Sequence, residues 1–248
     1  MSIYNYNLDR INLEIFPPDI WKNPNIIFHG TSEYHSQQIE RNGFVPATSP
    51  FNIDDARELI RVLQLPEIIP FDRPQLFGMT VSRSLNSYIF GIENNDFRLS
   101  FAYLSYLCVY YSTGRLKGGQ TFGNVRQAKV IIEEAIQTNP EVEDYITEPI
   151  NRLFQLESDV ADANGVVYAV KIEEPYNGIA MEYGNIHSTL AIPPNRIIGK
   201  VILSDDINLN EFTIDIAKQR NKQKLIKPNH LGIILNRMKL NEDQDDDV

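Results

Sequence analysis

A chain of 248 residues with 42% hydrophobic and 23% charged residues can bury a core without the help of disulfides or metal ions, which excludes a disordered or fibrous protein. The formal net charge of −10 disfavours long-range attraction to nucleic acid. The single cysteine, Cys108, excludes an internal disulfide, and the N-terminus has no basic and apolar leader, so we expect a cytoplasmic protein, with signal-free export as an alternative.

The first predicted elements are a strand, a glycine turn and a helix. Residues 25–29 have an apolar centre and are followed by Gly30, which predicts a short strand that ends in a turn. Thr31 or Ser32 can cap the next helix, and Gly43 is a natural C-terminal stop. The order strand, glycine, helix is typical of a strand end that binds a ligand.

A second strand is predicted between two further helices. Charged and apolar residues at helical spacing predict a helix over residues 53–65. Residues 76–81 are a strand candidate, and Ser82 after them is a good cap for a short helix that ends at Gly91. A strand therefore leads to a capped helix for the second time.

The middle of the chain is predicted to be helical and the last third to be β structure. The most apolar window, residues 99–111, is too short and too polar to span a bilayer, and we interpret it as a buried helix. Strands in the last third are separated by proline and glycine, so the pattern indicates an α+β fold. The predicted helices are 97–111, 125–136 and 142–158, and the predicted strands are 165–172, 178–181, 189–192 and 197–203.

One domain is expected because no repeat or low-complexity linker interrupts residues 25–240. We place an N-terminal extension at 1–24, the domain at 25–205, a basic segment packed on it at 206–240 and a disordered acidic tail at 241–248. Residues 218–239 hold seven Lys or Arg and no acid, whereas residues 242–247 hold five acids and no base. The body is acidic, so a protein partner is expected before nucleic acid.

The tripeptide His29–Gly30–Thr31 follows the first strand and is suited to binding a nucleotide. A glycine at a strand end lets a ligand approach the backbone, whose N–H and C=O can hold a planar carboxamide. The imidazole of His29 can hydrogen-bond a ribose hydroxyl. Alone, however, a histidine before a turn glycine is more often structural.

A second group of polar residues opens the helix after the second predicted strand. Ser82, Arg83 and Ser84 place two hydroxyls and a cation at a helix N-terminus, which suits amide or phosphate contacts. Tyr88 follows one to two turns later, and its ring can stack on a nicotinamide face. The alternative is a capped helix whose tyrosine lies in the core.

Together these two elements resemble the corresponding parts of the ADP-ribosyltransferase superfamily of the His-Tyr-Glu type, which includes diphtheria toxin and poly(ADP-ribose) polymerase. The resemblance covers residues 25–203 and implies a split mixed or antiparallel β core with a helical insertion and a C-terminal helical segment. It implies that His29 binds the adenosine ribose of NAD and that Tyr88 stacks on the nicotinamide. The implied cofactor-binding residues are Gly30, Thr31, Ser82, Arg83 and Ser84.

The third motif residue is the point at which this sequence departs from the family. There a glutamate on a late strand stabilises the oxocarbenium charge that develops as the glycosidic bond breaks. Glu182 occupies this position if the strand is 179–183, and Ser188 or Thr189 does if it is 188–192. We favour Glu182, because it is the nearest acid before Pro193–Pro194 and follows the apolar residues 179–181, whereas neither hydroxyl residue carries a negative charge.

The resemblance implies a mono-ADP-ribosyltransferase that uses NAD as a substrate and acts as a toxin, effector or defence factor. The acceptor is expected to be a protein, and an inhibitor or antitoxin is a possible partner. Two alternatives are a catalytically silent module that binds NAD or ADP-ribose, and a transferase that acts on RNA or DNA. One cysteine and four scattered histidines give no zinc spacing, so no metal is expected.

Overall fold

A computed structural model of the protein describes residues 1–8, 14–23, 25–46, 49–73, 79–94, 96, 98–173, 179–182 and 185–204. The described chain is a mixed α+β structure, as the sequence predicts. Residues 76–78 of the strand predicted at 76–81 lie outside the described residues, as do the basic segment and the acidic tail, and Val81 is the first residue of a helix. Among the described residues, no helix has the length and apolarity needed to cross a membrane.

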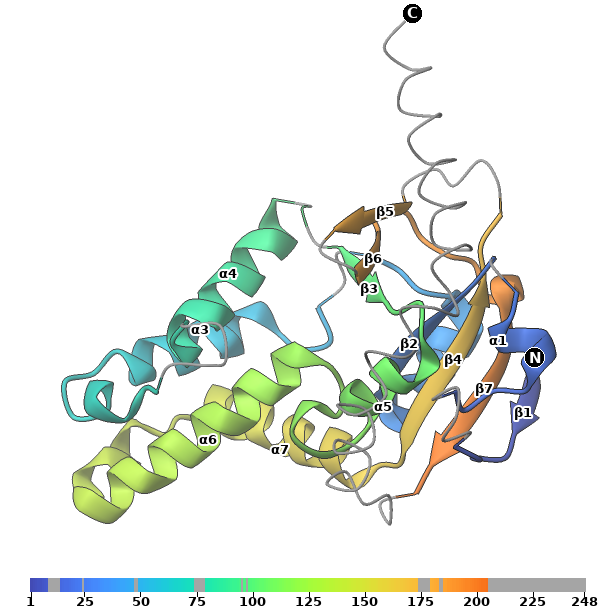
Figure 1. Ribbon diagram of the computed structural model, residues 1–248. Coiled ribbons are helices and arrows are strands. Elements are labelled where there is room, and N and C mark those ends of the chain that lie inside the picture. The colour runs from blue at the N-terminus through green and yellow to red at the C-terminus, as the bar shows by residue number, and fades with distance from the viewer. Residues whose placement is uncertain are drawn as a thin grey trace, which may run out of the picture.

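The fold is built on two sheets that meet at one backbone bridge (Figure 1). Phe28 and Ala102 exchange two backbone hydrogen bonds of 2.8 and 2.7 Å, which join β2 of the first sheet to the end of β3 in the second. Pairing is antiparallel except that β1 runs parallel to β7. The first sheet has the order β1 (Ser2–Tyr4), β7 (Ile197–Leu203), β4 (Gly165–Lys171) and β2 (Ile26–Ser32), and the second β3 (Leu99–Phe101), β6 (Asn185–Ser188) and β5 (Ile179–Glu182).

One face of the first sheet is covered by α5 (Ser105–Ser112) and by the segment that contains α1 (Pro18–Trp21). Its core combines apolar residues of β2 and β4 with residues of the N-terminal segment such as Ile15 and Trp21. The carboxylate of Glu14 fastens this segment, because it accepts hydrogen bonds from the backbone N–H and the hydroxyl of Ser105 at the start of α5 (3.2 and 2.5 Å).

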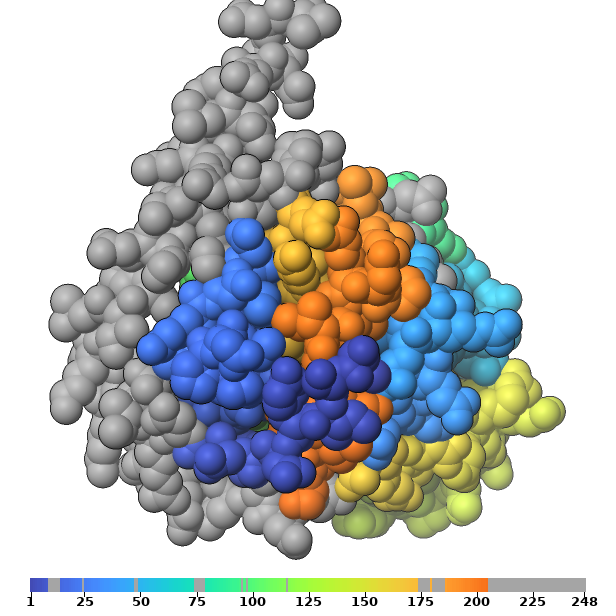
Figure 2. Space-filling view, turned by 90° about the vertical axis from the view of Figure 1, so that its right-hand side faces the viewer, coloured from blue at the N-terminus to red at the C-terminus, as the bar shows by residue number. Residues whose placement is uncertain are grey.

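These contacts make the first residues part of the fold. Ser2, Ile3 and Tyr4 pair with residues 199–201 of β7, so the chain's beginning lies beside its last described strand. Figure 2 shows this side of the molecule, where the dark blue N-terminal residues lie against orange residues. The sequence places a domain boundary at residue 25, whereas the structure includes residues on both sides of it in one sheet and one core.

The opposite face of the first sheet packs against the second sheet and α2 (Ser36–Asn42). Phe101 of β3 and Ile186 of β6 share a cluster with Tyr168 of β4. Phe44, which follows α2, packs edge-on against the rings of both Phe101 and Tyr168. Aromatic side chains therefore fill the space between the two sheets.

A layer of four helices forms a separate core to one side of the sheets (Figure 1). Its apolar residues recur at helical spacing on each helix, which is why these segments are readable from sequence. The helices are α3 (Ile53–Leu63), α4 (Val81–Glu93), α6 (Gln120–Thr138) and α7 (Glu148–Asp162), and short 3-10 turns lie at Glu33–His35, Ile69–Phe71, Gly114–Leu116, Pro140–Tyr145 and Pro194–Arg196.

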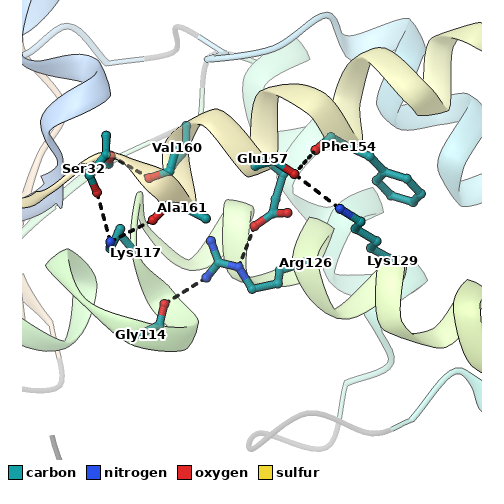
Figure 3. A network of polar contacts seen from close by, with 11 residues as sticks. Ser32, Gly114, Lys117, Arg126, Lys129, Phe154, Glu157, Val160 and Ala161 are labelled. Atoms are coloured by element: carbon teal, nitrogen blue, oxygen red, sulfur yellow. Dashed lines mark hydrogen bonds and ion pairs between the residues drawn. The ribbon is translucent and has the colours of Figure 1, made fainter. Parts of the chain in front are cut away.

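Polar contacts join this helical layer to the sheet (Figure 3). The hydroxyl of Ser32, at the end of β2, donates to the carbonyl of Val160 in α7 at 2.7 Å. The buried ammonium of Lys117 donates to two carbonyls at the end of α7, those of Ala161 (2.8 Å) and Ala163 (2.9 Å). A cation at a helix C-terminus is electrostatically favourable, so Lys117 also stabilises α7 itself.

Four expectations from the sequence are wrong in whole or in part. The turn expected at Gly30 is absent, because β2 continues to Ser32. Residues 97–111 are not one helix, because 99–101 form β3 and α5 begins only at Ser105. Residues 189–192 form no strand; β6 ends at Ser188, and Ile192 makes only an isolated bridge with Phe44. The cap of α4 is Thr80, whose hydroxyl accepts from the N–H of Arg83.

Candidate functional site

The tripeptide that the sequence singles out lies on β2 beside the bridge between the sheets. The pairing with β4 places His29 opposite Tyr168 and Gly30 opposite Val167. Thr31 is buried, with 4% of its surface exposed, so its side chain belongs to the core. Gly30 is buried as well, and His29 is half-buried, so within the tripeptide the side chain of His29 is the accessible group.

The ring of His29 is half-buried and held in place by aromatic and polar contacts. Its centroid lies 4.8 Å from that of Phe44 and 5.3 Å from that of Phe101. Nδ1 lies 2.9 Å from the carbonyl oxygen of Ser100 on β3. A carbonyl can only accept, so Nδ1 carries the proton and donates. Burial lowers the pKa of His29, which favours the neutral ring and leaves the lone pair of Nε2 free to accept a hydrogen bond.

The backbone of Gly30 points away from β4. In an antiparallel pair, alternate residues bond to the same neighbour. Phe28 bonds to Ala102 on the far side, and Glu33 bonds to Asn164 on the β4 side. By this alternation, the N–H and C=O of Gly30 lie on the same edge as those of Phe28, where β2 and the second sheet separate.

Gly30 is also in close contact with α5. A Cβ at this position would lie 2.1 Å from the carbonyl oxygen of Cys108 and 2.7 Å from the hydroxyl of Ser112. The thiol of Cys108 accepts hydrogen bonds from the backbones of Ala102 and Gly30, but burial, which is the larger effect, raises its pKa. A buried thiol is a weak acceptor, so a ligand carbonyl is a stronger partner for this edge.

The second predicted group lies at the start of α4 in the helical layer. The carboxylate of Asp72 binds the first residues of this helix: it accepts hydrogen bonds from the N–H of Val81 at 2.8 Å and from the hydroxyl of Ser82 at 2.5 Å. Arg83 is exposed and Ser84 is half-buried. Ser82 is therefore engaged within the protein, which the sequence could not show because Asp72 lies ten residues earlier.

Tyr88 packs inside the helical layer. Its ring centroid lies 5.6 Å from that of Phe51, and burial raises its pKa to about 12, although a hydrogen bond with Ser49 opposes the shift. His29 packs instead against Phe44 and Phe101, in the cluster between the two sheets. The structure thus places the two predicted residues in separate clusters.

Aromatic rings connect the side of β2 to Tyr88. His35, in the turn after β2, lies 5.5 Å from Phe122, which lies 6.0 Å from Phe51. Burial, together with a smaller effect of the nearby His29, lowers the pKa of His35 to about 4. His35 is half-buried.

The candidates for the third motif position lie on or beside the second sheet. Glu182 is the last residue of β5 and pairs in register with Asn185 of β6; β5 lies two strand spacings, roughly 10 Å, from β3. Ser188 is buried, and its hydroxyl donates to the carbonyl of Leu190 at 2.8 Å. Thr189 is exposed beyond the end of β6. Among these residues only Glu182 offers a carboxylate.

The structure also brings together two residues that the sequence did not suggest. Ser100 on β3 pairs directly with His187 on β6, and the Ser100 hydroxyl lies 3.3 Å from Nδ1 of His187. Ser100 is therefore linked to two histidines, through its carbonyl to His29 and through its hydroxyl to His187. An alternating pattern, Leu99–Ser100–Phe101, was the available signal, but the apolar run around it obscured the strand.

No group of three or more His, Cys, Asp or Glu side chains that could hold a metal ion occurs in the part of the chain that the structure describes. Comparison of the chain with family models, with curated proteins and with solved structures gives no match. The chemistry of the site is therefore argued from its own geometry.

Proposed function

We propose that this protein is a NAD-dependent mono-ADP-ribosyltransferase whose site is built on β2. The observation that supports this most directly is a neutral His29 beside the buried Gly30, whose backbone N–H and C=O are directed away from β4 on the same strand. The backbone N–H and C=O of Gly30 match the complementary groups of the nicotinamide carboxamide. Nε2 of His29 can accept a hydrogen bond that a ribose hydroxyl donates.

The reaction would break the glycosidic bond between nicotinamide and ribose. The pyridinium nitrogen takes the bonding electrons and nicotinamide leaves as a neutral molecule, while positive charge develops on the ribose. A carboxylate near this ribose lowers the barrier by electrostatic stabilisation. Glu182 is the residue we assign to this role, and a nucleophile on a protein is the acceptor we favour.

Calorimetry with NAD and an assay of nicotinamide release test this proposal. We expect His29→Ala to weaken NAD binding about tenfold, because one hydrogen bond of about 1.4 kcal/mol is lost. We expect Glu182→Gln to retain binding and to slow nicotinamide release. Gln137→Ala, at an exposed position on α6, is the control and should change neither. A wild-type protein that neither binds nor cleaves NAD would contradict the proposal.

The packing of Tyr88 favours a second candidate, a silent module that binds NAD or ADP-ribose and works through a partner. Tyr88 lies against Phe51 and the hydroxyl of Ser82 is held by Asp72, so two of the expected contacts are used within the protein. NAD binding without nicotinamide release in the same experiments would support this candidate. Label transfer from NAD to proteins of a lysate would exclude it.

The cellular role and the partners are part of the same proposal. A toxin, effector or defence factor with an inhibitor or antitoxin would fit a mono-ADP-ribosyltransferase. The basic residues 218–239, on which an RNA or DNA acceptor would depend, lie outside the described residues. Comparing label transfer to protein, to RNA and to DNA decides between these acceptors.

A further inference from the structure

We propose that residues 230–240 of this chain form a helix that packs on the outer face of α5. This face consists of Leu104, Leu107, Tyr110 and Tyr111, and α5 itself lies across β2 and β4 of the first sheet (Figure 1). Three observations support the docking: the apolar character of this face, the place where the described chain ends, and the sequence of the C-terminal residues. The docking does not depend on the proposed function.

The outer face of α5 is apolar throughout. Leu107 is three residues from Tyr110 and four from Tyr111, so these side chains lie on one side of the helix, and Leu104 precedes them by one turn. Tyr111 is 41% exposed, and the other three side chains are half-buried. A helix at the surface of a globular protein ordinarily has polar and charged side chains on its outer side. The apolar side chains here indicate that another layer packs on α5.

The inner side of α5 is already packed on the first sheet. A Cβ on Gly30 of β2 would lie 2.1 Å from the carbonyl oxygen of Cys108, so α5 and the strand are in direct contact. Among the described residues, the elements in closest contact with α5 are β2, β4 and the turn Gly114–Leu116. The inner residues recur at helical spacing and are buried; they are Ser105, Cys108, Val109 and Ser112. The outer face is therefore the side on which a further partner can pack.

The described chain ends beside α5. Leu203, at the end of β7, pairs with Gly165 of β4, and a Cβ on Gly165 would lie 1.9 Å from the carbonyl oxygen of Ser112, the last residue of α5. Residues 205–248 therefore continue from a point next to the C-terminal end of this helix. Residues 205–229 can span up to roughly 80 Å, whereas α5 is only about 12 Å long. Residues 230–240 can thus reach the whole outer face.

The C-terminal sequence contains a helix pattern with an apolar stripe. Its apolar residues are spaced as on one face of a helix; they are Leu231, Ile234, Leu235 and Met238. Asn229, which follows Pro228, is a good N-terminal cap, and Arg237 and Lys239 occupy the last turn, where the helix dipole favours cations. A helix of this length is marginal alone in water, so its stripe needs a surface on which to pack.

Charge complementarity favours the same location. α7 ends next to the last described residues, and Asp159 and Asp162 are exposed in its last turn, where the helix dipole disfavours acids. Residues 218–227 hold five Lys or Arg and no acid, so the segment that leads to residue 230 brings cations towards these carboxylates. Because this segment is joined to the chain beside α5, its effective concentration there is high, which favours its own α5 over that of a second copy.

Photocrosslinking of the full chain tests this docking. Tyr111→Cys is labelled with a thiol-reactive benzophenone, which spares the buried Cys108, and crosslinked peptides are mapped by mass spectrometry after irradiation. We expect crosslinks from position 111 to residues 230–240 of the same chain. Gln137→Cys, at an exposed position on α6, is labelled as the control and should give no crosslink to this segment.

A pair of charge variants in the Tyr111→Cys chain tests the apolar stripe. Leu235→Asp places a carboxylate within the stripe, and we expect the yield of the crosslink to fall about tenfold or more, because a charge strongly opposes burial. Asn236→Asp adds the same charge at the next residue, on another side of the helix, and should leave the yield unchanged.

Three results would overturn the proposal. The first is the absence of crosslinks between position 111 and residues 230–240. The second is a crosslink that joins two chains and rises with protein concentration, because the segment would then belong to a second copy. The third is an equal yield in Leu235→Asp and Asn236→Asp. Thermal unfolding of each variant shows that a loss of crosslinking does not arise from misfolding.

Discussion

At the scale of single residues, Gly30 is important both for packing against α5 and for the proposed ligand contacts of its backbone. One side of it is in contact with α5, where a Cβ would lie 2.1 Å from a backbone oxygen. The edge of the strand presents its N–H and C=O where the two sheets separate. The glycine is therefore needed for packing even if no ligand binds, and stability measurements address that need separately from NAD binding.

Replacing Gly30 by alanine should destabilise the protein. The neighbour is backbone of α5 and cannot rotate away, so we expect a loss of about 1–3 kcal/mol or more in the free energy of unfolding. Gly91→Ala is the matched control: its Cβ would meet nothing closer than 3.9 Å in the interior of α4, and we expect a gain of about 0.5–1 kcal/mol. Urea denaturation measures both. If both substitutions changed the free energy of unfolding equally, the close contact between Gly30 and α5 would not be the cause of the loss.

His35 predicts a pH dependence of stability. Its pKa is lowered by burial to about 4, below the ordinary value of 6.5, so the unfolded chain binds a proton more readily than the folded one. The stabilisation is complete above about pH 6.5 and is lost as the pH falls towards about 4, by at most about 1.4 kcal/mol per pH unit. His35→Phe keeps a ring against Phe122 and cannot titrate. Its unfolding free energy should depend less steeply on pH in this window, and parallel pH curves would contradict the assignment.

At the scale of elements, the start of α4 is stabilised by residues that are far apart in sequence. Thr80 caps the helix locally, and Asp72 reaches it from a preceding turn. A carboxylate at a helix N-terminus is favoured by the helix dipole as well as by its hydrogen bonds.

Asp72→Ala should lower the stability of the protein by about 1–2 kcal/mol, because the N–H of Val81 and the hydroxyl of Ser82 lose their acceptor. Asp54→Ala, in the first turn of α3 where the cap is Asn52, is the comparison and should cost less. Urea denaturation again measures the change. A loss no larger than that of Asp54→Ala would show that Asp72 does not hold α4.

The elements that the sequence predicts best are those with a clear local period. The amphipathic helices α3, α6 and α7 and the apolar strands β4 and β7 lie close to their predicted positions, because their patterns reflect burial on one or both faces. β3 was missed because Leu99–Phe101 is continuous in sequence with the apolar α5. Its partner β6 supplies the hydrogen bonds that make it a strand, and such long-range pairing leaves no local signal.

The candidate site was predictable only in part for the same reason. The strand around His29 is confirmed, but Gly30 lies within β2, which continues to Ser32, so the turn predicted at Gly30 is wrong. The engagement of Ser82 by Asp72 and the pairing of Ser100 with His187 both depend on contacts across the fold. A single sequence carries no periodicity that reports them.

At the scale of the whole molecule, the N-terminal residues complete the sheet and its core. Removing residues 1–24 deletes β1 and the buried Ile15, Phe16 and Trp21, and it leaves the start of α5 without the carboxylate of Glu14. We expect this truncated chain to lose its cooperative unfolding transition. Removing only residues 1–6, whose side chains are exposed or half-buried, should cost much less. Circular dichroism during thermal unfolding compares the two, and equal transitions would contradict the assignment.

The pairing of β1 with β7 also determines when the protein can finish folding. The four helices of the helical layer all lie within residues 53–162, which also contain β3 and α5, so this layer can form once residue 162 has been synthesised, apart from its contacts with β2. Residues 2–4 and the apolar segment near Trp21 must wait until residues 197–203 have left the ribosome. At about 5–20 residues per second, that interval lasts roughly 10–40 s. For this time the beginning of the chain is exposed to chaperones and proteases, and a stall in synthesis before β7 would leave it so.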